Sequence, residues 1–298
     1  MEWLFFAALS TLFWSLNSVL SKVLIDKRFD KPLPFVILLI LVDFVFMAVI
    51  GLIFPISHVL PYSAYVIAIG MFVVCSFWFF YHAMRQEEGS RVVSLTQTAP
   101  LMTAVLSALL LGEVLVARQY VGIVLLVASS IIVSHKKTES GRKMSAALKY
   151  AIVFALAIAL YNVATKYMLH YIDYWSFFFW STLGMVLDVP LLLLVPSVRA
   201  DFRRMLSMMD RKTLAACALN ESLWFLGNVC LLVAISIGFV SLVSAVGALQ
   251  PLFVLVIASM LSVFTPKLLK EDIGKGHLLE KLSAALMIFV GIWLISMA

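Results

Sequence analysis

Residues 220–230, NESLWFLGNVC, place polar side chains at helical spacing inside an apolar segment. Asn220, Trp224 and Asn228 stand four residues apart, so one face of a helix would carry two amides and an indole ring, with Glu221 beside them. A carboxylate and an aromatic plane suit a ligand that has an ammonium group or several hydrogen-bonding groups, and a buried carboxylate can also carry a proton. The alternative interpretation is a hydrogen-bonded cluster that holds neighbouring helices together.

Two other apolar segments carry polar side chains that could face this set. Trp14 and Asn17 lie in the first segment, and Asn162 lies in a corresponding later one. The two asparagines are candidates to line a cavity, because a polar group inside a membrane needs a partner or water. Lys22 and Lys166 stand near the ends of these segments, where snorkelling to the interface is an equal alternative to a functional role.

Ionisable groups within apolar segments are costly, about 2.5–3.5 kcal/mol for a charge at a helix centre on insertion scales. Asp43 and Asp188 align with one another at a shift of 145 residues. We interpret them as structural anchors, with a proton relay as the alternative. Tyr81, His82 and Arg85 close another segment, where a gate and an ion pair with the glutamates that follow are both consistent with the sequence. A histidine near a membrane boundary can titrate in the physiological range.

The elements that must position these residues are membrane helices. The chain of 298 residues is 63% hydrophobic and 13% charged, with a mean hydropathy of +1.07, whereas soluble domains are about half apolar and one-quarter charged. The basic residues behind the net charge of +6 lie in short loops, which excludes nucleic acid as a partner. The three cysteines fall in apolar segments without ligand spacing, so neither a disulfide framework nor a zinc site is expected.

Ten apolar segments are expected to span the membrane as helices, so the chain is predicted to be an all-α, multi-pass membrane protein. The first segment lacks the basic leader and cleavage site of a signal peptide, and we expect it to be retained. Most basic residues fall in odd-numbered connections, which predicts cytoplasmic odd-numbered loops and both termini on the outer side of a plasma or inner membrane. The predicted spans are residues 2–24, 33–54, 62–84, 91–112, 116–135, 146–168, 174–196, 213–237, 239–263 and 277–297.

The sequence also contains an internal repeat. A shift of 151 residues aligns Pro100 with Pro251. Each half then holds five spans, in residues 1–135 and 146–298, joined by a basic loop at 136–145. Because five is odd, the second half crosses the membrane in the opposite sense, which predicts ten transmembrane helices arranged as two inverted five-helix repeats.

The two aligned prolines stand beside glutamines, Gln97 in the first half and Gln250 in the second. A proline inside a span removes one helix hydrogen bond and kinks the helix, so the freed carbonyl must find a partner in protein or in a wet cavity. One such kink is ordinary packing, but two at matching positions indicate helices bent around a central cavity. Glu113 ends the fourth span and aligns with Phe264, so we interpret it as a helix-terminus or ion-pairing residue rather than a ligand for substrate.

The segment HAMRQEEGSRVVSLTQTAPLMTAVLSALLLGEVLVARQYVGIVLLVASSIIV resembles the EamA module of the drug/metabolite transporter superfamily. The matching features are a small-residue turn at Ala83, a proline span at Pro100, the Gly112-Glu113 end, and a last helix with Gly122. The resemblance implies a ten-helix transporter with inverted halves and a central cavity lined mainly by helices one, three, four, six, eight and nine. The second half departs from the pattern, because a long charged connection replaces its Gly-Glu end.

A secondary transporter or exporter of small organic metabolites, such as amino acids or amines, is therefore the leading hypothesis. The two halves would rock to give alternating access, with energy from protons or from the solute gradient. No nucleotide-binding motif, metal-ligand set or catalytic motif occurs, so neither an enzyme nor a cofactor is expected; a membrane scaffold and an intramembrane enzyme are the alternatives. The expected partners are the lipid bilayer, a small organic solute and protons, with the protein a monomer or a weak homodimer.

The candidate residues form three groups. Substrate-binding candidates are Trp14, Asn17, Tyr81, Gln97, Asn162, Asn220, Glu221, Trp224, Asn228 and Gln250; proton-coupling candidates are Glu221, Asp43, Asp188 and His82; helix-kink residues are Pro100 and Pro251.

Overall fold

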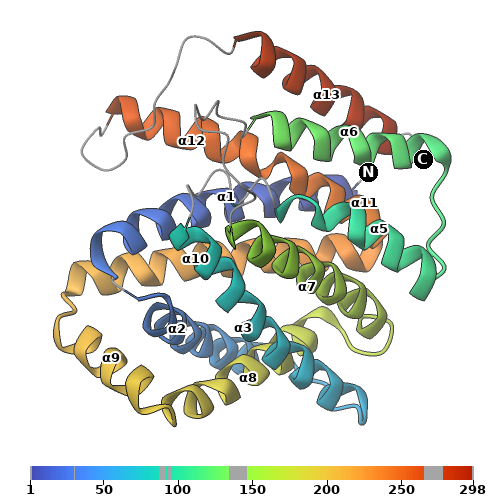
Figure 1. The fold of residues 1–298 in the computed structure, drawn as a ribbon. Coiled ribbons are helices and arrows are strands. Elements are labelled where there is room, and N and C mark those ends of the chain that lie inside the picture. The colour runs from blue at the N-terminus through green and yellow to red at the C-terminus, as the bar shows by residue number, and fades with distance from the viewer. Residues whose placement is uncertain are drawn as a thin grey trace.

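The computed structural model describes residues 2–29, 31–86, 92, 96–133, 146–264 and 278–296 (Figure 1). Within these ranges every regular element is a helix, as predicted. The elements are α1 (Glu2–Arg28), α2 (Pro32–Ile53), α3 (Tyr62–Gln86), α5 (Ala99–Leu110), α6 (Ala117–Val133), α7 (Ala146–Met168), α8 (Tyr174–Leu193), α9 (Pro196–Ser207), α10 (Arg211–Ile237), α11 (Val240–Val246), the 3-10 helix η1 (Gly247–Leu249), α12 (Gln250–Phe264) and α13 (Leu278–Ser296). The predicted basic loop at 136–145 and most of the charged connection after α12 lie outside the described ranges.

Six of the described helices are long and apolar enough to cross a bilayer: α1, α2, α3, α7, α8 and α10. Four of the predicted spans correspond to shorter apolar helices, because α5, α6, α12 and α13 each supply fewer described apolar residues. The ninth predicted span is not one continuous α-helix, since α11, η1 and α12 follow each other end to end. Apolar length thus locates the helices, and local geometry divides some of them.

Helix α9 was not predicted, because residues 197–212 were assigned to a loop. The helix is too short and too polar to cross a membrane. Phe202 is buried in a core cluster with residues of α2 and α8, while Arg203 and Arg204 stay exposed. Asp201 also pairs with Lys31 of the connection between α1 and α2 at 2.8 Å. One buried ring and one exposed ion pair therefore hold this helix against the bundle.

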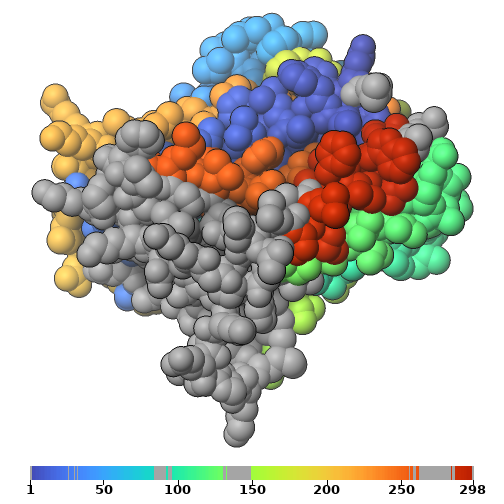
Figure 2. Space-filling model, turned by 90° about the horizontal axis from the view of Figure 1, so that it is seen from above, coloured from blue at the N-terminus to red at the C-terminus, as the bar shows by residue number. Residues whose placement is uncertain are grey.

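Helices from the two halves of the chain are interleaved. α1 packs along α10 and touches α12, while α3 packs along both α7 and α8. α2 meets α8, α5 meets α7 and α11, and α6 pairs with α13. Seen from above, α13 (red) lies against α6 (green), and α12 (orange) runs beside α1 (blue) (Figure 2). Neither half forms a separate body with its own core.

Glycines allow two of these helix pairs to approach backbone to backbone. A Cβ atom added to Gly70 of α3 would lie 1.9 Å from the carbonyl oxygen of Ser181 in α8, and one on Gly184 of α8 would lie 2.1 Å from that of Ile67. Gly122 of α6 and a glycine of α13 meet in the same way. Small residues at such crossings are how membrane helices gain contact where lipid supplies no hydrophobic drive.

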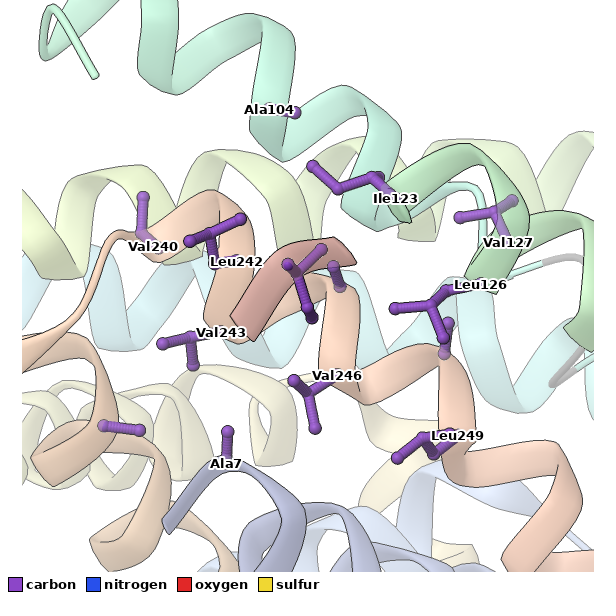
Figure 3. Close-up of a cluster of buried hydrophobic side chains, with 14 of the residues drawn as sticks. Ala7, Ala104, Ile123, Leu126, Val127, Val240, Leu242, Val243, Val246 and Leu249 are labelled. Atoms are coloured by element: carbon purple, nitrogen blue, oxygen red, sulfur yellow. The ribbon is translucent and has the colours of Figure 1, made fainter. Parts of the chain in front are cut away.

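The largest apolar cluster surrounds α11. Val240, Val243 and Val246 project from α11 toward Ala104 of α5 and Ala7 of α1, and residues of α6 complete the cluster (Figure 3). These side chains are at most 4% exposed. Burial of the apolar side chains of α11 fixes the turn that precedes it, between α10 and α11.

Opposite charges hold the turn from α10 to α11. Lys166 of α7 donates hydrogen bonds from Nζ to the carbonyls of Ile235 (2.7 Å) and Gly238 (2.8 Å), at the end of α10. Glu113 accepts a hydrogen bond from the backbone N–H of Val240, at the start of α11, with Oε2 3.0 Å away. A cation at a helix C-terminus and an anion at an N-terminus are both stabilising. The interpretation of Glu113 as a helix-terminus residue is confirmed, and Lys166 binds protein rather than snorkelling to water.

The chain before Glu113 shows why a glycine precedes it. Gly112 ends α5 with φ of 69°, in the left-handed region that favours glycine. This turn directs the next side chain away from α5 and toward α11. Burial raises the pKa of Glu113, and the nearby Lys166 charge and the hydrogen bonds from Ser241 and Val240 act in the opposite direction.

Candidate functional site

A cavity of about 230 Å³ lies between the helices of both halves. Residues of α1, α2, α3, α5, α7, α8, α10, α11 and α12 line it, together with Thr96, Gln97 and Gly247. The set is wider than the resemblance implied, since the second and seventh spans, which are α2 and α8, were not among the lining helices that it named. The volume is below the range of about 300–1,000 Å³ typical of drug-sized sites, so the cavity suits a small solute.

Nine of the ten substrate-binding candidates line this cavity. They are Trp14, Asn17, Tyr81, Gln97, Asn162, Glu221, Trp224, Asn228 and Gln250. The tenth, Asn220, is fully buried behind the wall. Of the kink residues, Pro100 lines the cavity, whereas Pro251 is buried one position beyond the lining residue Gln250.

The seam between α1 and α10 explains why Asn220 turns away from the cavity. Asn17 donates from Nδ2 to the backbone carbonyl of Asn220 at 2.8 Å, and Ser21 donates to its Oδ1 at 3.1 Å. The Nδ2 group of Asn220 donates in turn to Oε1 of Glu221 at 3.1 Å. The backbone carbonyl oxygen, Oδ1 and Nδ2 of Asn220 therefore all take part in hydrogen bonds within the protein. Asn220 thus positions Glu221 instead of contacting a solute.

Glu221 and Asp43 bring two carboxyl groups together. Both residues are 3% exposed, and their side chains lie in hydrogen-bonding contact with each other. Such a bond needs one proton between the two groups, because an ionised carboxylate can only accept. Oδ1 of Asp43 has no hydrogen-bond partner among the described residues. The pair joins α2 of the first half to α10 of the second.

Tyr81 extends this network to α3. It is 8% exposed and makes a side-chain hydrogen bond with Ser21, close to both carboxyl groups. Tyr81, Ser21, Asn220, Glu221 and Asp43 therefore form one chain of polar contacts across four helices. In a low-dielectric interior the hydrogen-bonded members of such a chain are held rigidly, whereas a polar atom left without a partner, such as Oδ1 of Asp43, is costly.

The opposite side of the cavity is held by weaker polar contacts. Gln250 donates from Nε2 to Ser18 at 3.0 Å. Asn162 lies 3.5 Å from Ser244, which donates to Thr103 at 3.3 Å. The first of these contacts links α12 to α1, and the other two link α7 to α11 and α11 to α5, each by a single hydrogen bond between side chains.

The backbone changes geometry before each aligned proline. In the first half, Gln97 and Thr98 form a turn before α5, and in the second half η1 precedes α12. The two changes stand at matching places in the two halves, and both border the cavity through Gln97 and Gly247. Bending at these points turns the glutamine side chains inward.

Two proton-coupling candidates lie outside the lining. Asp188 on α8 is buried, and its Oδ2 has no partner among the described residues. His82 on α3 stacks on Trp78, with ring centroids 4.4 Å apart, and meets Tyr150 of α7 at 5.4 Å. Asp188 therefore does not join its aligned partner Asp43 in the cavity lining. The side chain of Arg85 and the glutamates after it lie outside the described part of the chain, so the gate suggested for that region is not described.

Some lining residues had not been predicted. One is Ser244, which donates a hydrogen bond to Thr103 behind the lining and stands in a segment whose other polar residues gave no helical stripe. Phe77 and Phe154 form an aromatic contact on the wall, with centroids 6.0 Å apart. Phe77 stands four residues before Tyr81, a spacing that could have placed it on the same face. Phenylalanines in an apolar span otherwise carry no signal that separates a cavity from lipid.

The charges around the cavity are of one sign. Asp43 and Glu221 line it, and among the described residues no lysine, arginine or histidine does. The described residues also contain no group of three or more His, Cys, Asp or Glu able to hold a metal ion. The arrangement can therefore offer carboxyl oxygens, amides, hydroxyls and aromatic faces to a solute.

Comparisons with known proteins agree with this architecture. A solved crystal structure, described only as that of a protein, superimposes with a TM-score of 0.72 at 16% sequence identity, covering 98% of this chain and 95% of that chain. At this identity the likeness concerns the fold alone, which it supports over nearly the whole length. A search of curated proteins found no match. With its membrane-length helices the chain is a multi-pass membrane protein, and its residues 1–135 match the model of the EamA-like transporter family.

Proposed function

We propose that the protein is a secondary transporter of small organic solutes, with the central cavity as its substrate site. One observation carries the proposal: polar side chains from helices of both halves converge on one cavity in a multi-pass membrane protein. Broken or kinked helices around a central site are the usual construction of such proteins. The family whose model matches residues 1–135 supports the same function.

The proposed mechanism is alternating access by two inverted five-helix repeats. The helix contacts support it, because they map onto themselves when the halves are exchanged. The contact of α1 with α10 corresponds to that of α7 with α3, and the contact of α1 with α12 corresponds to that of α7 with α5. Pairs such as α2–α8 and α6–α13 correspond to themselves.

The interleaving changes which bodies would move. α3 meets α8 backbone to backbone, so these helices of opposite halves must move together. We propose that one bundle of α3, α5, α7 and α8 rocks against a second bundle of α1, α2, α10 and α12. This differs from rocking of the two sequence halves, which the internal repeat predicts. Asp43 and Glu221 remain the candidates for a coupling proton, since both face the space between the bundles.

The test of alternating access needs no knowledge of the substrate. Asn228 lines the cavity, and its side chain donates a hydrogen bond to the carbonyl of Trp224 on its own helix. We would therefore introduce Asn228→Cys into a protein whose native cysteines are replaced by alanine. A membrane-impermeant maleimide would then be applied to sealed vesicles from either side, in right-side-out and inverted preparations.

A transporter should be labelled from both sides, because its cavity opens to each in turn. Leu109→Cys on α5 is the matched control, because Leu109 is 76% exposed on the apolar surface and should be labelled from neither side. Labelling of Asn228→Cys from one side only, or from none, would contradict alternating access. That result would favour the scaffold alternative, in which the same polar residues only hold helices together.

A further inference from the structure

The carboxyl pair gives the cavity a chemical preference that the fold alone does not. We propose that Asp43 and Glu221 bind the positively charged group of a small organic cation, such as an alkylammonium or arylalkylammonium ion. This inference rests on the proposed function, because it names the substrate class of the same cavity. Both residues line the cavity, and both are almost fully buried.

The first step of the argument is charge. Two carboxyl groups in contact inside apolar surroundings cannot both be ionised unless a positive charge joins them. No basic side chain lines the cavity among the described residues, so the protein supplies no such charge there. An ammonium group placed against the pair would provide it, with donors for the carboxyl oxygens.

The second step is the unused acceptor. Oδ1 of Asp43 is buried without a hydrogen-bond partner among the described residues. Asn220 and Asp43 both engage Glu221, whereas nothing described engages this oxygen of Asp43. A buried acceptor left unpaired costs about 1–3 kcal/mol. The cation would pair this oxygen, so the cost is removed when the site is filled.

The third step is the apolar part of the ligand. Trp14, Phe77, Tyr81 and Trp224 contribute aromatic faces to the lining. Aromatic faces attract organic cations through their quadrupoles and also pack against their carbon atoms. A metal ion would instead require several oxygen or nitrogen ligands, and the described residues hold no cluster of three or more His, Cys, Asp or Glu for one. The walls therefore fit an organic ammonium ion better than an inorganic one.

Net charge distinguishes this class from zwitterions. An amino acid would bring a carboxylate into a space that already holds two carboxyl groups. No described lining side chain carries the positive charge that such a carboxylate needs. Within the metabolites first considered, the structure thus favours amines over amino acids. The cavity volume of about 230 Å³ has room for compounds of about the size of phenylethylamine.

The test compares three probes of nearly equal size on the purified full-length protein. Phenethylammonium chloride carries the cation, 2-phenylethanol replaces it by a neutral group, and phenylalanine adds a carboxylate. Binding is measured by isothermal titration and by thermal shift, with wild type beside Asp43→Asn, Glu221→Gln and Asp188→Asn. The last variant is the matched control, because Asp188 is the aligned buried carboxyl that lies outside the cavity lining.

We expect phenethylammonium to bind wild type and Asp188→Asn equally. Each cavity variant should weaken it by about thirtyfold or more, the loss seen when one partner of a buried charge pair is removed. 2-Phenylethanol and phenylalanine should bind much more weakly than the cation. Thermal unfolding of each unliganded variant shows whether it folds, and Glu221→Asp, which keeps the charge but shortens its reach, replaces any variant that does not.

Three results would overturn the proposal. Equal affinities for phenethylammonium and 2-phenylethanol would show that the site does not recognise the positive charge of the ligand. A higher affinity for phenylalanine would assign the site to zwitterions. If the affinity for the cation is unchanged in both cavity variants, or if a folded wild-type protein does not bind it, Asp43 and Glu221 do not form a cation site. None of these results affects the labelling of Asn228→Cys, so failure of the cation site and failure of alternating access are separate findings.

Discussion

Replacing Gly184 by alanine tests whether the seam between α3 and α8 is a rigid contact. The added Cβ would lie 2.1 Å from the carbonyl oxygen of Ile67, and ordinary contact begins at 3.4 Å. The helices would therefore have to separate by about 1.3 Å at this point, and a gap of 0.5–1 Å already forfeits a quarter to a half of the attraction between facing atoms.

The expected cost follows from two opposing terms. Overpacking a well-packed interior costs about 1–3 kcal/mol, and the upper part of that range applies because the obstacle is backbone. Alanine recovers about 1 kcal/mol of helix propensity relative to glycine. The net loss for Gly184→Ala is then about 1–2 kcal/mol, or roughly 2–8 °C in melting temperature at about 2–4 °C for each kcal/mol.

The assay is thermal unfolding in detergent, followed by fluorescence, with two control variants. Gly247→Ala places its Cβ where no atom lies within 4 Å, so its melting temperature should be unchanged or slightly raised. Gly51→Ala meets the Phe179 ring at 2.9 Å, and because a ring can move, its loss should be smaller than that of Gly184→Ala. If Gly184→Ala melts at the wild-type temperature, the α3–α8 seam is not the tight contact inferred here, and the proposed bundle of α3, α5, α7 and α8 loses its basis.

Three further predictions concern helix ends. Lys166→Met removes the donor to two carbonyls at the end of α10, and we expect it to lower the free energy of unfolding by about 1–3 kcal/mol. The control is Lys149→Met, at an exposed position of the same helix α7, which should change the free energy of unfolding by less than about 0.5 kcal/mol. Equal melting temperatures for the two variants would contradict the role of Lys166. Burial raises the pKa of Glu113 above 4.5, so the stability it contributes is full below that value and is lost as pH rises through the higher folded pKa. Glu113→Gln should therefore flatten the decline of melting temperature across that window, and an unchanged slope would refute the assignment. Hydrogen bonds from Thr213 lower the pKa of Asp210 below 3.8, so its capping of α10 is present above that value and is lost as pH falls through the folded pKa. Asp210→Ala should be less stable than wild type at neutral pH and approach it in acid, and a difference that persists in acid would point to another cause.

The helices were predictable because membrane spans are set by apolar length, a property each segment carries by itself. The neighbours of each helix were not, since lipid and protein interior are equally apolar and leave little trace of which face meets which. Asp43 shows the difference. Its presence in a span marked it as unusual, but the second span was not among the predicted lining helices, and only the packing of α2 against α10 brings Asp43 to Glu221.

The polar stripe on α10 was predicted more fully, because three of its members share one helix and one spacing. Asn220 was nevertheless assigned to the substrate, whereas it uses its hydrogen bonds on Asn17, Ser21 and Glu221. Spacing places residues on a common face but does not say which of them a neighbouring helix will engage. α9 was missed for a related reason, since one buried Phe202 is too short a signal for a helix.

The long separation of paired helices has a consequence for how the chain is made. Asn17 and Asn220 are joined by a 2.8 Å hydrogen bond but are 203 residues apart. At a synthesis rate of about 5–20 residues per second, α1 is complete roughly 10–40 seconds before α10 emerges. During that interval Asn17 and Asp43 lie in newly inserted helices without the partner that later engages them, and polar groups in hydrocarbon are costly. The residues that make the cavity in the finished protein are therefore the ones that depend most on shelter by the insertion machinery during biogenesis.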